Sequence, residues 1–229
     1  MIYGWITIFL CAGIPLLGAV FFLFYKKATI YTFFMGAACF FLSQLILRIP
    51  LLNWLSGHND WFALAPYTNP VLYTAILAFS AGIFEETGRW IFMKYPCKGK
   101  DTWMHGVSFG LGHGGIEAVW VLTLSVIPSL LNGTLSLAGW EVILVGLERL
   151  CAMSFHIAMS ILVLIGVRKK RFRFCAAAIL IHGIFDLTTI IPTHGIIWAI
   201  LALCAIASLA FTLWAKSRIF IEKEKGEKL

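Results

Sequence analysis

The chain has 229 residues, of which 60% are hydrophobic and only 13% are charged, and its mean hydropathy is +0.89. A water-soluble domain of this length has no interior large enough for so much apolar surface. The formal net charge is +7, but the basic residues stand in short clusters between apolar runs. That pattern is typical of membrane topology and argues against nucleic-acid binding. We expect one transmembrane domain over residues 1–229, in a cell membrane of the bacterial cytoplasmic type.

Apolar runs of about 20 residues are long enough to cross a bilayer core of about 30 Å. Seven runs meet this length, at 3–24, 29–52, 70–93, 103–125, 144–167, 174–192 and 195–215. The first has no basic segment before it and is too long for a signal-peptide core, so we expect a retained helix. The polar and aromatic stretch 53–69 is expected to be a connection. The predicted fold is all-α, a multi-pass membrane bundle of about seven transmembrane helices.

The positions of Lys and Arg support this number of helices and give their orientation. Basic clusters follow the first, third, fifth and seventh runs, whereas the connections 53–69, 126–143 and 193–194 contain neither residue. Of the 18 basic residues, fifteen therefore fall on one side, and only Arg48, Arg89 and Arg149 lie inside runs. Because basic loops stay in the cytoplasm, we predict an outside N-terminus, a cytoplasmic C-terminus and a charged cytoplasmic tail at about 216–229.

The six cysteines form no CxxC pair, and five of them lie within apolar runs. We interpret them as small core side chains and not as disulfides or metal ligands.

Ionisable side chains inside the runs are the main functional signal. Each costs about 2.5–3.5 kcal/mol to insert, so they persist where they are paired or needed for function. The runs contain Arg48, Glu85, Glu86, Arg89, Glu117, Glu148, Arg149 and Asp186, together with His105, His113, His156 and His182.

Helix geometry gathers several of these groups at one depth. At about 1.5 Å per residue, acids or histidines on four runs lie roughly 12–18 Å from the basic ends. We therefore expect a site in the cytoplasmic half, reached from the cytoplasm or sideways from the bilayer. His182 and Asp186 share a helix face because they are four residues apart. Glu85 and Glu86 diverge by about 100°, so one should do chemistry while the other pairs with Arg89.

Glycines mark the fourth run as a close-packing helix. Gly106, Gly110 and Gly114 form a doubled GxxxG pattern, which lets helix backbones approach closely in lipid. We expect this stripe to bring His113 against the helix that carries Glu85 and Arg89.

Two kinds of hydrolytic chemistry fit these groups. A carboxylate beside imidazoles in a dry pocket can act as a general base on water, and a histidine near an aspartate can stabilise an oxyanion. Zinc is the alternative, with a metal-bound water as nucleophile and candidate ligands His113, His156, His182 and Glu85. The sequence contains no HExxH motif, and we favour no cofactor, with zinc kept as the open possibility.

Four segments together resemble the YhfC family of intramembrane proteases, which is similar to the group containing the CAAX prenyl proteases and PrsW. They are FEETGRW (84–90), GLGHGGIEA (110–118), ERLCAMSFH (148–156) and HGIFD (182–186). The resemblance implies an intramembrane endopeptidase that hydrolyses a peptide bond in or near the bilayer, with a hydrophobic or membrane-associated peptide or protein as substrate.

The resemblance also implies roles for individual residues. Glu85, or its neighbour Glu86, would activate water, and His113, which ends the FxxxH motif begun by Phe109, would help bind that water. His182 and Asp186 would line the oxyanion site. His156 has no counterpart in the CAAX pattern and takes a supporting or ligand role. Support from structure or substrate contacts is expected of Arg89, Phe109, Glu117, Glu148 and Arg149. The spacing EExxR differs from the CAAX spacing EExxxR, so a prenylated substrate is not implied.

Other functions fit the same buried groups. Intramembrane carboxylates and histidines also mark proton or ion paths, so a coupled transporter is the main alternative, although we find no internal repeat of the kind that many transporters have. A haem protein and a non-catalytic peptide-binding relative are the others. Glutamate-type and zinc-type proteolysis both remain open at this stage, with the glutamate type favoured.

Overall fold

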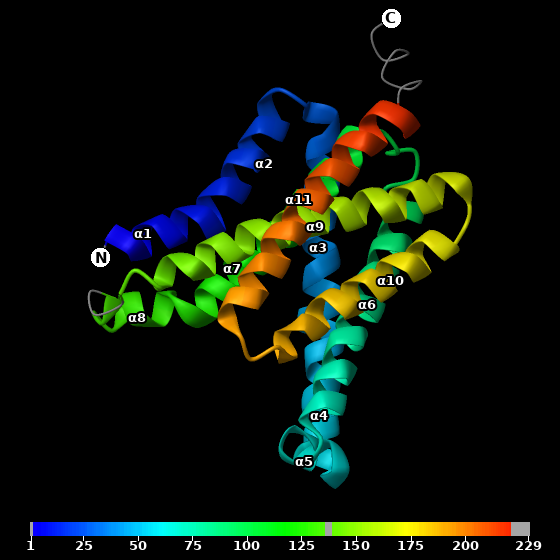
Figure 1. The fold of residues 1–229 in the computed structure, drawn as a ribbon. Helices are drawn as coiled ribbons and strands as arrows, with labels where there is room; N and C mark the ends of the chain where they lie inside the picture. The colour runs from blue at the N-terminus through cyan, green and yellow to red at the C-terminus, as the bar shows by residue number, and fades with distance from the viewer. Residues whose placement is uncertain (1, 136–138, 221–229) are drawn as a thin grey trace, which may run out of the picture.

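The computed structural model describes residues 2–135 and 139–220. These residues are helical with short connections and include no β-strand, so the predicted all-α membrane bundle is confirmed (Figure 1). Of the expected charged tail at 216–229, residues 221–229 lie outside the described residues.

Within the described residues, six helical segments are long and apolar enough to cross a membrane. They are Ile2–Phe24, Ile30–His58, Trp103–Ser125, Val142–Lys169, Arg173–Ile190 and His194–Ile219. The helix pair Asp60–Thr68 and Pro70–Lys94 passes the same test together but is bent by 115° at the break, and counting it as one span brings the number to seven. These segments correspond to the seven predicted runs.

The first two crossings are long rods interrupted by π-helical turns. The first consists of α1 (Ile2–Ile8), η1 (Phe9–Gly13) and α2 (Ile14–Phe24). The second consists of α3 (Ile30–Phe40), η3 (Phe41–Arg48) and α4 (Ile49–His58). It continues past the predicted end at residue 52, so the expected connection is largely helical. The rest of that stretch forms α5 (Asp60–Thr68), which Asn59 caps by accepting from the Phe62 amide.

The remaining helices follow one another in chain order with short connections. They are α6 (Pro70–Lys94), α7 (Trp103–Ser125), the short α8 (Ile127–Leu131), α9 (Val142–Lys169), α10 (Arg173–Leu187) with the 3-10 turn η5 (Thr188–Ile190), and α11 (His194–Ile219). A proline at the first position of α6 and a threonine cap before α7 are typical starts for helices.

Glycines on two faces of α7 allow it to pack closely between α3 and α9. A Cβ at Gly110 would lie 2.5 Å from the Cα of Ile157 on α9, and one at Gly112 would lie 1.9 Å from the Phe33 carbonyl oxygen on α3. The stripe Gly106, Gly110 and Gly114 therefore packs on α9 and not on the α6 helix that the sequence led us to expect. Contact with α6 comes from side chains instead.

Most of the apolar core lies toward the basic ends of the helices. Buried side chains from α6, α7, α9, α10 and α11 meet there, including Met93, Phe109, Ile161, Leu164 and Phe220. All six cysteines are free, and four of them are buried, in agreement with the interpretation of cysteines as core residues.

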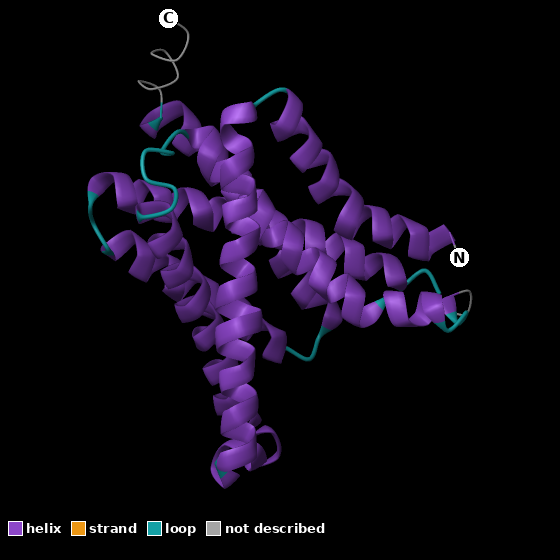
Figure 2. Cartoon of the chain, turned by 180° about the vertical axis from the view of Figure 1, so that it is seen from behind, coloured by secondary structure: helices purple, strands orange, loops and turns teal. Residues whose placement is uncertain are grey.

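The helices spread apart at the other end of the molecule. Figures 1 and 2 show α4, α5 and the first half of α6 as one arm, and α1, α8 and the adjacent ends of α7 and α9 as another. The site lies where the two arms join.

Candidate active site

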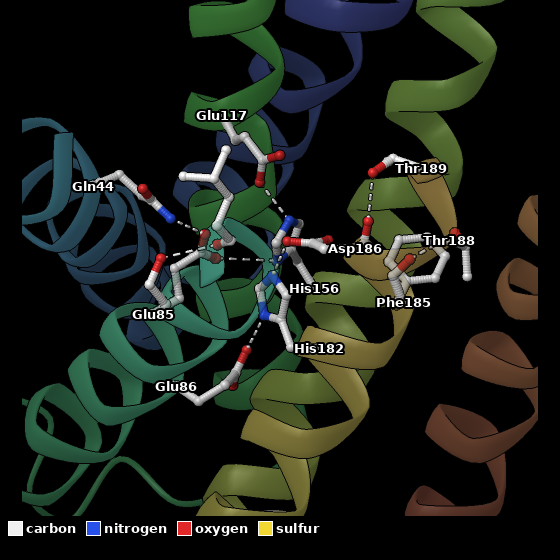
Figure 3. A network of polar contacts seen from close by, with 12 residues as sticks. Gln44, Glu85, Glu86, Glu117, His156, His182, Phe185, Asp186, Thr188 and Thr189 are labelled. Atoms are coloured by element: carbon white, nitrogen blue, oxygen red, sulfur yellow. Dashed lines mark hydrogen bonds and ion pairs between the residues drawn. The ribbon is translucent and has the colours of Figure 1, made fainter. Parts of the chain in front are cut away.

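Four helices bring the expected acids and histidines to one place (Figure 3). Helix α6 supplies two glutamates and an arginine, and α7, α9 and α10 each supply one histidine. Each of these side chains belongs to a residue at most 3% exposed: Glu85, Glu86, Arg89, His113, His156 and His182. The convergence that helix depth predicted is present in the structure.

Glu85 is held by neighbours on two other helices. Its Oε1 accepts a hydrogen bond from Gln44 Nε2 at 2.5 Å, and its Oε2 lies 2.9 Å from His113 Nε2. Arg89 Nη2 approaches the same Oε2 at 3.5 Å. Glu85 also lines a cavity. Its carboxylate is therefore held in one orientation by its neighbours and is still accessible from the cavity.

Glu86 faces away from that cavity and is fully buried. Its Oε1 forms the ion pair with Arg89 and accepts from His182 Nδ1 at 2.7 Å. The expected division of the two glutamates is therefore visible: Glu86 is the more tightly paired partner of Arg89, while Glu85 faces open space.

His156 bridges the two halves of the polar network. Arg89 Nη2 lies 2.6 Å from its Nδ1, and its Nε2 directly contacts Glu117 Oε2. Because a guanidinium has only donors, Nδ1 accepts and the ring proton sits on Nε2, facing Glu117. Glu117 is in turn paired with Arg149 at 2.7 Å. This histidine, which sequence motifs left without a counterpart, therefore links the α6 cluster to α7.

His182 and Asp186 lie on one face of α10, as their spacing predicted. His182 Nε2 lies 3.6 Å from Asp186 Oδ2, which is longer than a hydrogen bond. The Phe155 ring packs edge-on against His182 at 5.4 Å and stacks on Phe185 at 4.6 Å. These rings fix the imidazole while Asp186 stays partly exposed in the cavity.

The expected supporting residues divide into two groups. Arg149, Glu148 and Glu117 form a paired cluster in the cavity wall. Phe109 is 1% exposed and belongs to the apolar core one turn from His113, so it lies outside the cavity wall.

Gln44 is a site residue that sequence reasoning missed. Its amide oxygen accepts from Arg48 Nη1 at 2.9 Å, which turns its nitrogen toward Glu85. Arg48 is itself anchored to the Leu77 carbonyl oxygen at 2.6 Å and to Ser80 Oγ at 3.0 Å. A search for ionisable groups passes over an amide. The signal that could have found it is a glutamine in an apolar run, four residues before an intramembrane arginine.

A cavity of about 550 Å³ opens beside these groups. The ionisable side chains that line it include Glu85, His156, His182 and Asp186, and the apolar ones include Phe155. This volume lies within the range of sites that bind small ligands, roughly 300–1,000 Å³, so it has room for only a short stretch of peptide.

The donor set of this site fits a metal ion in type and closeness. Glu85, His113 and His156 each offer one ligand atom, and these atoms lie within 4.8 Å of one another. Two histidines, one carboxylate and an open position are typical of catalytic zinc. His156 Nδ1 lies 3.9 Å from Glu85 Oε2 and is also the atom that Arg89 Nη2 contacts, so a metal bound through this nitrogen would displace the arginine. His182, the fourth expected ligand, is not part of this group, and its Nδ1 contacts Glu86 instead.

Comparison with known proteins gives a consistent result. The sequence profile of a family described as "YhfC intramembrane metalloprotease" matches residues 13–135 and 129–207. A protein of Bacillus subtilis (strain 168) named "Uncharacterized membrane protein YhfC" is 31% identical over 226 residues, covering 84% of this chain and 87% of that protein. Both matches include α6, α7, α9 and α10.

Proposed function

This chain belongs to the YhfC family of intramembrane metalloproteases, and from that premise we propose that it is an endopeptidase in which Glu85 activates the attacking water. The observation that carries the proposal is the placement of Glu85. It is the glutamate of α6 that is both fixed by Gln44 and His113 and open to the cavity.

Hydrolysis at this site would follow general-base chemistry. The Glu85 carboxylate takes a proton from water while the water oxygen attacks the peptide carbonyl carbon. The C–N bond then breaks, and Glu85 returns the proton to the leaving amine. His113 contacts the same carboxylate oxygen at 2.9 Å, so its ring orients the base beside the water position.

A donor for the developing oxyanion is available on α10. His182 donates from Nδ1 to Glu86, and its Nε2 lies 3.6 Å from Asp186, which lines the cavity together with His182. We assign this ring, oriented by Glu86 and the Phe155 ring, to the oxyanion. Since Nδ1 already donates to Glu86, the ring would donate to the oxyanion from Nε2 as the imidazolium, and the carboxylates of Glu86 and Asp186 on either side would balance its charge.

The zinc-dependent variant of this function is the second candidate, and the cluster of Glu85, His113 and His156 favours it. These three residues would hold the ion, and Glu117 would support His156 as carboxylates support many metal-bound histidines. A bound zinc would polarise the substrate carbonyl and lower the pKa of water.

The test compares newly exposed peptide N-termini in membranes from cells that make the wild type or Glu85→Gln. Glutamine keeps the shape and the Gln44 contact but cannot take a proton. We expect N-termini that appear only with the wild type, and these would identify the substrate. Identical sets at equal protein levels would contradict the assignment of Glu85 and direct attention to ion transport by the same buried groups.

Metal content separates the two variants of the mechanism. Stoichiometric zinc in the purified wild type that is lost in His113→Ala would support the metal variant. Full cleavage by protein that contains no zinc would support the glutamate variant.

A further inference from the structure

The cavity extends from the site in one direction along every helix that lines it. On α6 its lining comes from Thr74, Leu77, Ala78, Ala81 and Glu85, all on the Pro70 side of the site. None of the lining residues comes from the eight residues between Glu85 and Lys94. The lining therefore stops at Glu85 and leads away from the basic end of the helix.

The other helices repeat this asymmetry. On α7 the lining residues Glu117, Trp120 and Val121 all follow His113, toward the end at Ser125. On α9 they run from Glu148 to His156, in the half before the site. Helix α10 contributes His182, Phe185 and Asp186, and the lining continues into η5. Each set points to the connections that carry no Lys or Arg.

The basic side of the site is closed by packed side chains. Met93, Phe109, Ile161 and Leu164 are each at most 4% exposed and belong to one apolar cluster. The crevice bordered there by Met93, Phe109 and His105 has no space for a water molecule. Water and a peptide substrate can therefore reach the site through the cavity on one side, while packed apolar side chains block the basic side.

We propose that this site receives water and substrate from the membrane face opposite the basic connections, which the positive-inside rule makes the extracytoplasmic face. This route differs from the entry from the cytoplasm or sideways from the bilayer that the depth of the site suggested. This inference rests on the proposed function for the identity of the substrate. It specifies that substrate as a short extended segment near the outer surface of a membrane-anchored protein.

The dimensions and lining of the cavity agree with such a segment. At about 1.5 Å per residue, the fifteen helical steps from Pro70 to Glu85 span about 22 Å, so an outer segment must reach inward along α6. The cavity is lined both by apolar side chains, such as Ile49, Val121 and Leu201, and by the charged groups of Arg48 and Asp186. An apolar peptide with its backbone exposed would find both contact surface and hydrogen-bonding groups there.

Cysteine accessibility tests the direction of access without any need for cleavage. Ala81→Cys puts a thiol in the cavity one turn from Glu85, and Ala178→Cys puts one in the sealed core. Lys98→Cys marks the exposed basic side. A small charged methanethiosulfonate reagent is applied to right-side-out and to inverted membrane vesicles, with the wild type as the baseline for native cysteines.

We expect Ala81→Cys to react in right-side-out vesicles and not in inverted ones, Lys98→Cys to react in the reverse sense, and Ala178→Cys to stay unmodified in both. Reaction of Ala81→Cys only in inverted vesicles, or in neither preparation, would overturn the inference. If Ala81→Cys does not accumulate, Thr189→Cys at the exposed mouth takes its place. Because labelling needs no catalysis, a failure of proteolysis and a failure of the access route give different results.

Discussion

Glu85 and Glu86 are neighbours in the chain with different surroundings. Helical geometry predicted that the two would diverge and that one would pair with Arg89. The sequence could not say which one, because Arg89 stands three residues from one and four from the other, and both spacings allow a pair. The structure encloses Glu86 and leaves Glu85 at the cavity. Their catalytic roles stay predictions.

Replacement of Gln44 tests how the proposed base is positioned. Gln44→Leu removes the donor to Glu85 Oε1. A hydrogen bond to a charged group contributes roughly 1.5–3 kcal/mol, so we expect kcat to fall by about one to two orders of magnitude in a folded protein. Gln44→Glu adds a negative charge beside Glu85 and should reduce kcat further. Cleavage rates of detergent-purified variants measure this, and unchanged kcat in both would remove Gln44 from the site.

Glu86→Gln is expected to weaken the fold more than the chemistry. Arg89 is fully buried, and removing a buried ion partner costs about 3–5 kcal/mol. Glu148→Gln is the matched control, since Glu148 is partly exposed and Arg149 keeps its second partner Glu117, so its loss should cost less. Thermal unfolding in detergent compares the two. A Glu86→Gln protein as stable as the control, yet inactive, would make Glu86 the chemical group.

At the scale of helices, the glycines of α7 show the limit of pattern reasoning. The doubled GxxxG correctly predicted close backbone approach but gave the wrong neighbour. Glycines occur on several faces of α7, and spacing alone does not say which helix packs on which face. In the structure, Gly110 meets α9 while Gly112 meets α3.

Gly112→Ala tests the contact between α3 and α7. The added Cβ would lie 1.9 Å from the Phe33 carbonyl oxygen, and backbone atoms cannot move aside as a side chain does. Overpacking of this kind costs about 1–3 kcal/mol or more. Gly57→Ala is the control because its Cβ would meet nothing within 4 Å. We expect lower accumulation and a lower Tm for Gly112→Ala only, and equal Tm values would show that the two helices are less tightly packed.

The whole molecule was the most predictable level. Composition and run length predicted a multi-pass helical bundle. The basic clusters predicted which connections lie on the same side of the membrane. The sequence did not reveal that 53–58 continues a helix or that α5 meets α6 at 115°. That stretch is polar and aromatic, so hydropathy does not mark it as helix. Helix counting also predicted that these acids and histidines would meet at one level of the bundle, but not the open side of the site, which depends on how the helices spread.

The predicted orientation of the chain can be tested at its C-terminus. The basic clusters place that end in the cytoplasm, so a fluorescent protein that folds only in the cytoplasm should fluoresce when fused after residue 229. Alkaline phosphatase, which folds only outside, should be inactive at the same position. The opposite pair of results would reverse the orientation and, with it, the face from which the cavity is reached.

The central claim is that Glu85 is the base of a hydrolytic site. The most direct measurement is the single-turnover cleavage rate of the identified substrate by purified protein in liposomes, for the wild type and Glu85→Gln at equal folded amounts. General-base catalysis contributes typically about 10²–10⁴-fold, so we predict a loss of that size with substrate binding retained. A Glu85→Gln protein that cleaves at the wild-type rate would contradict the claim.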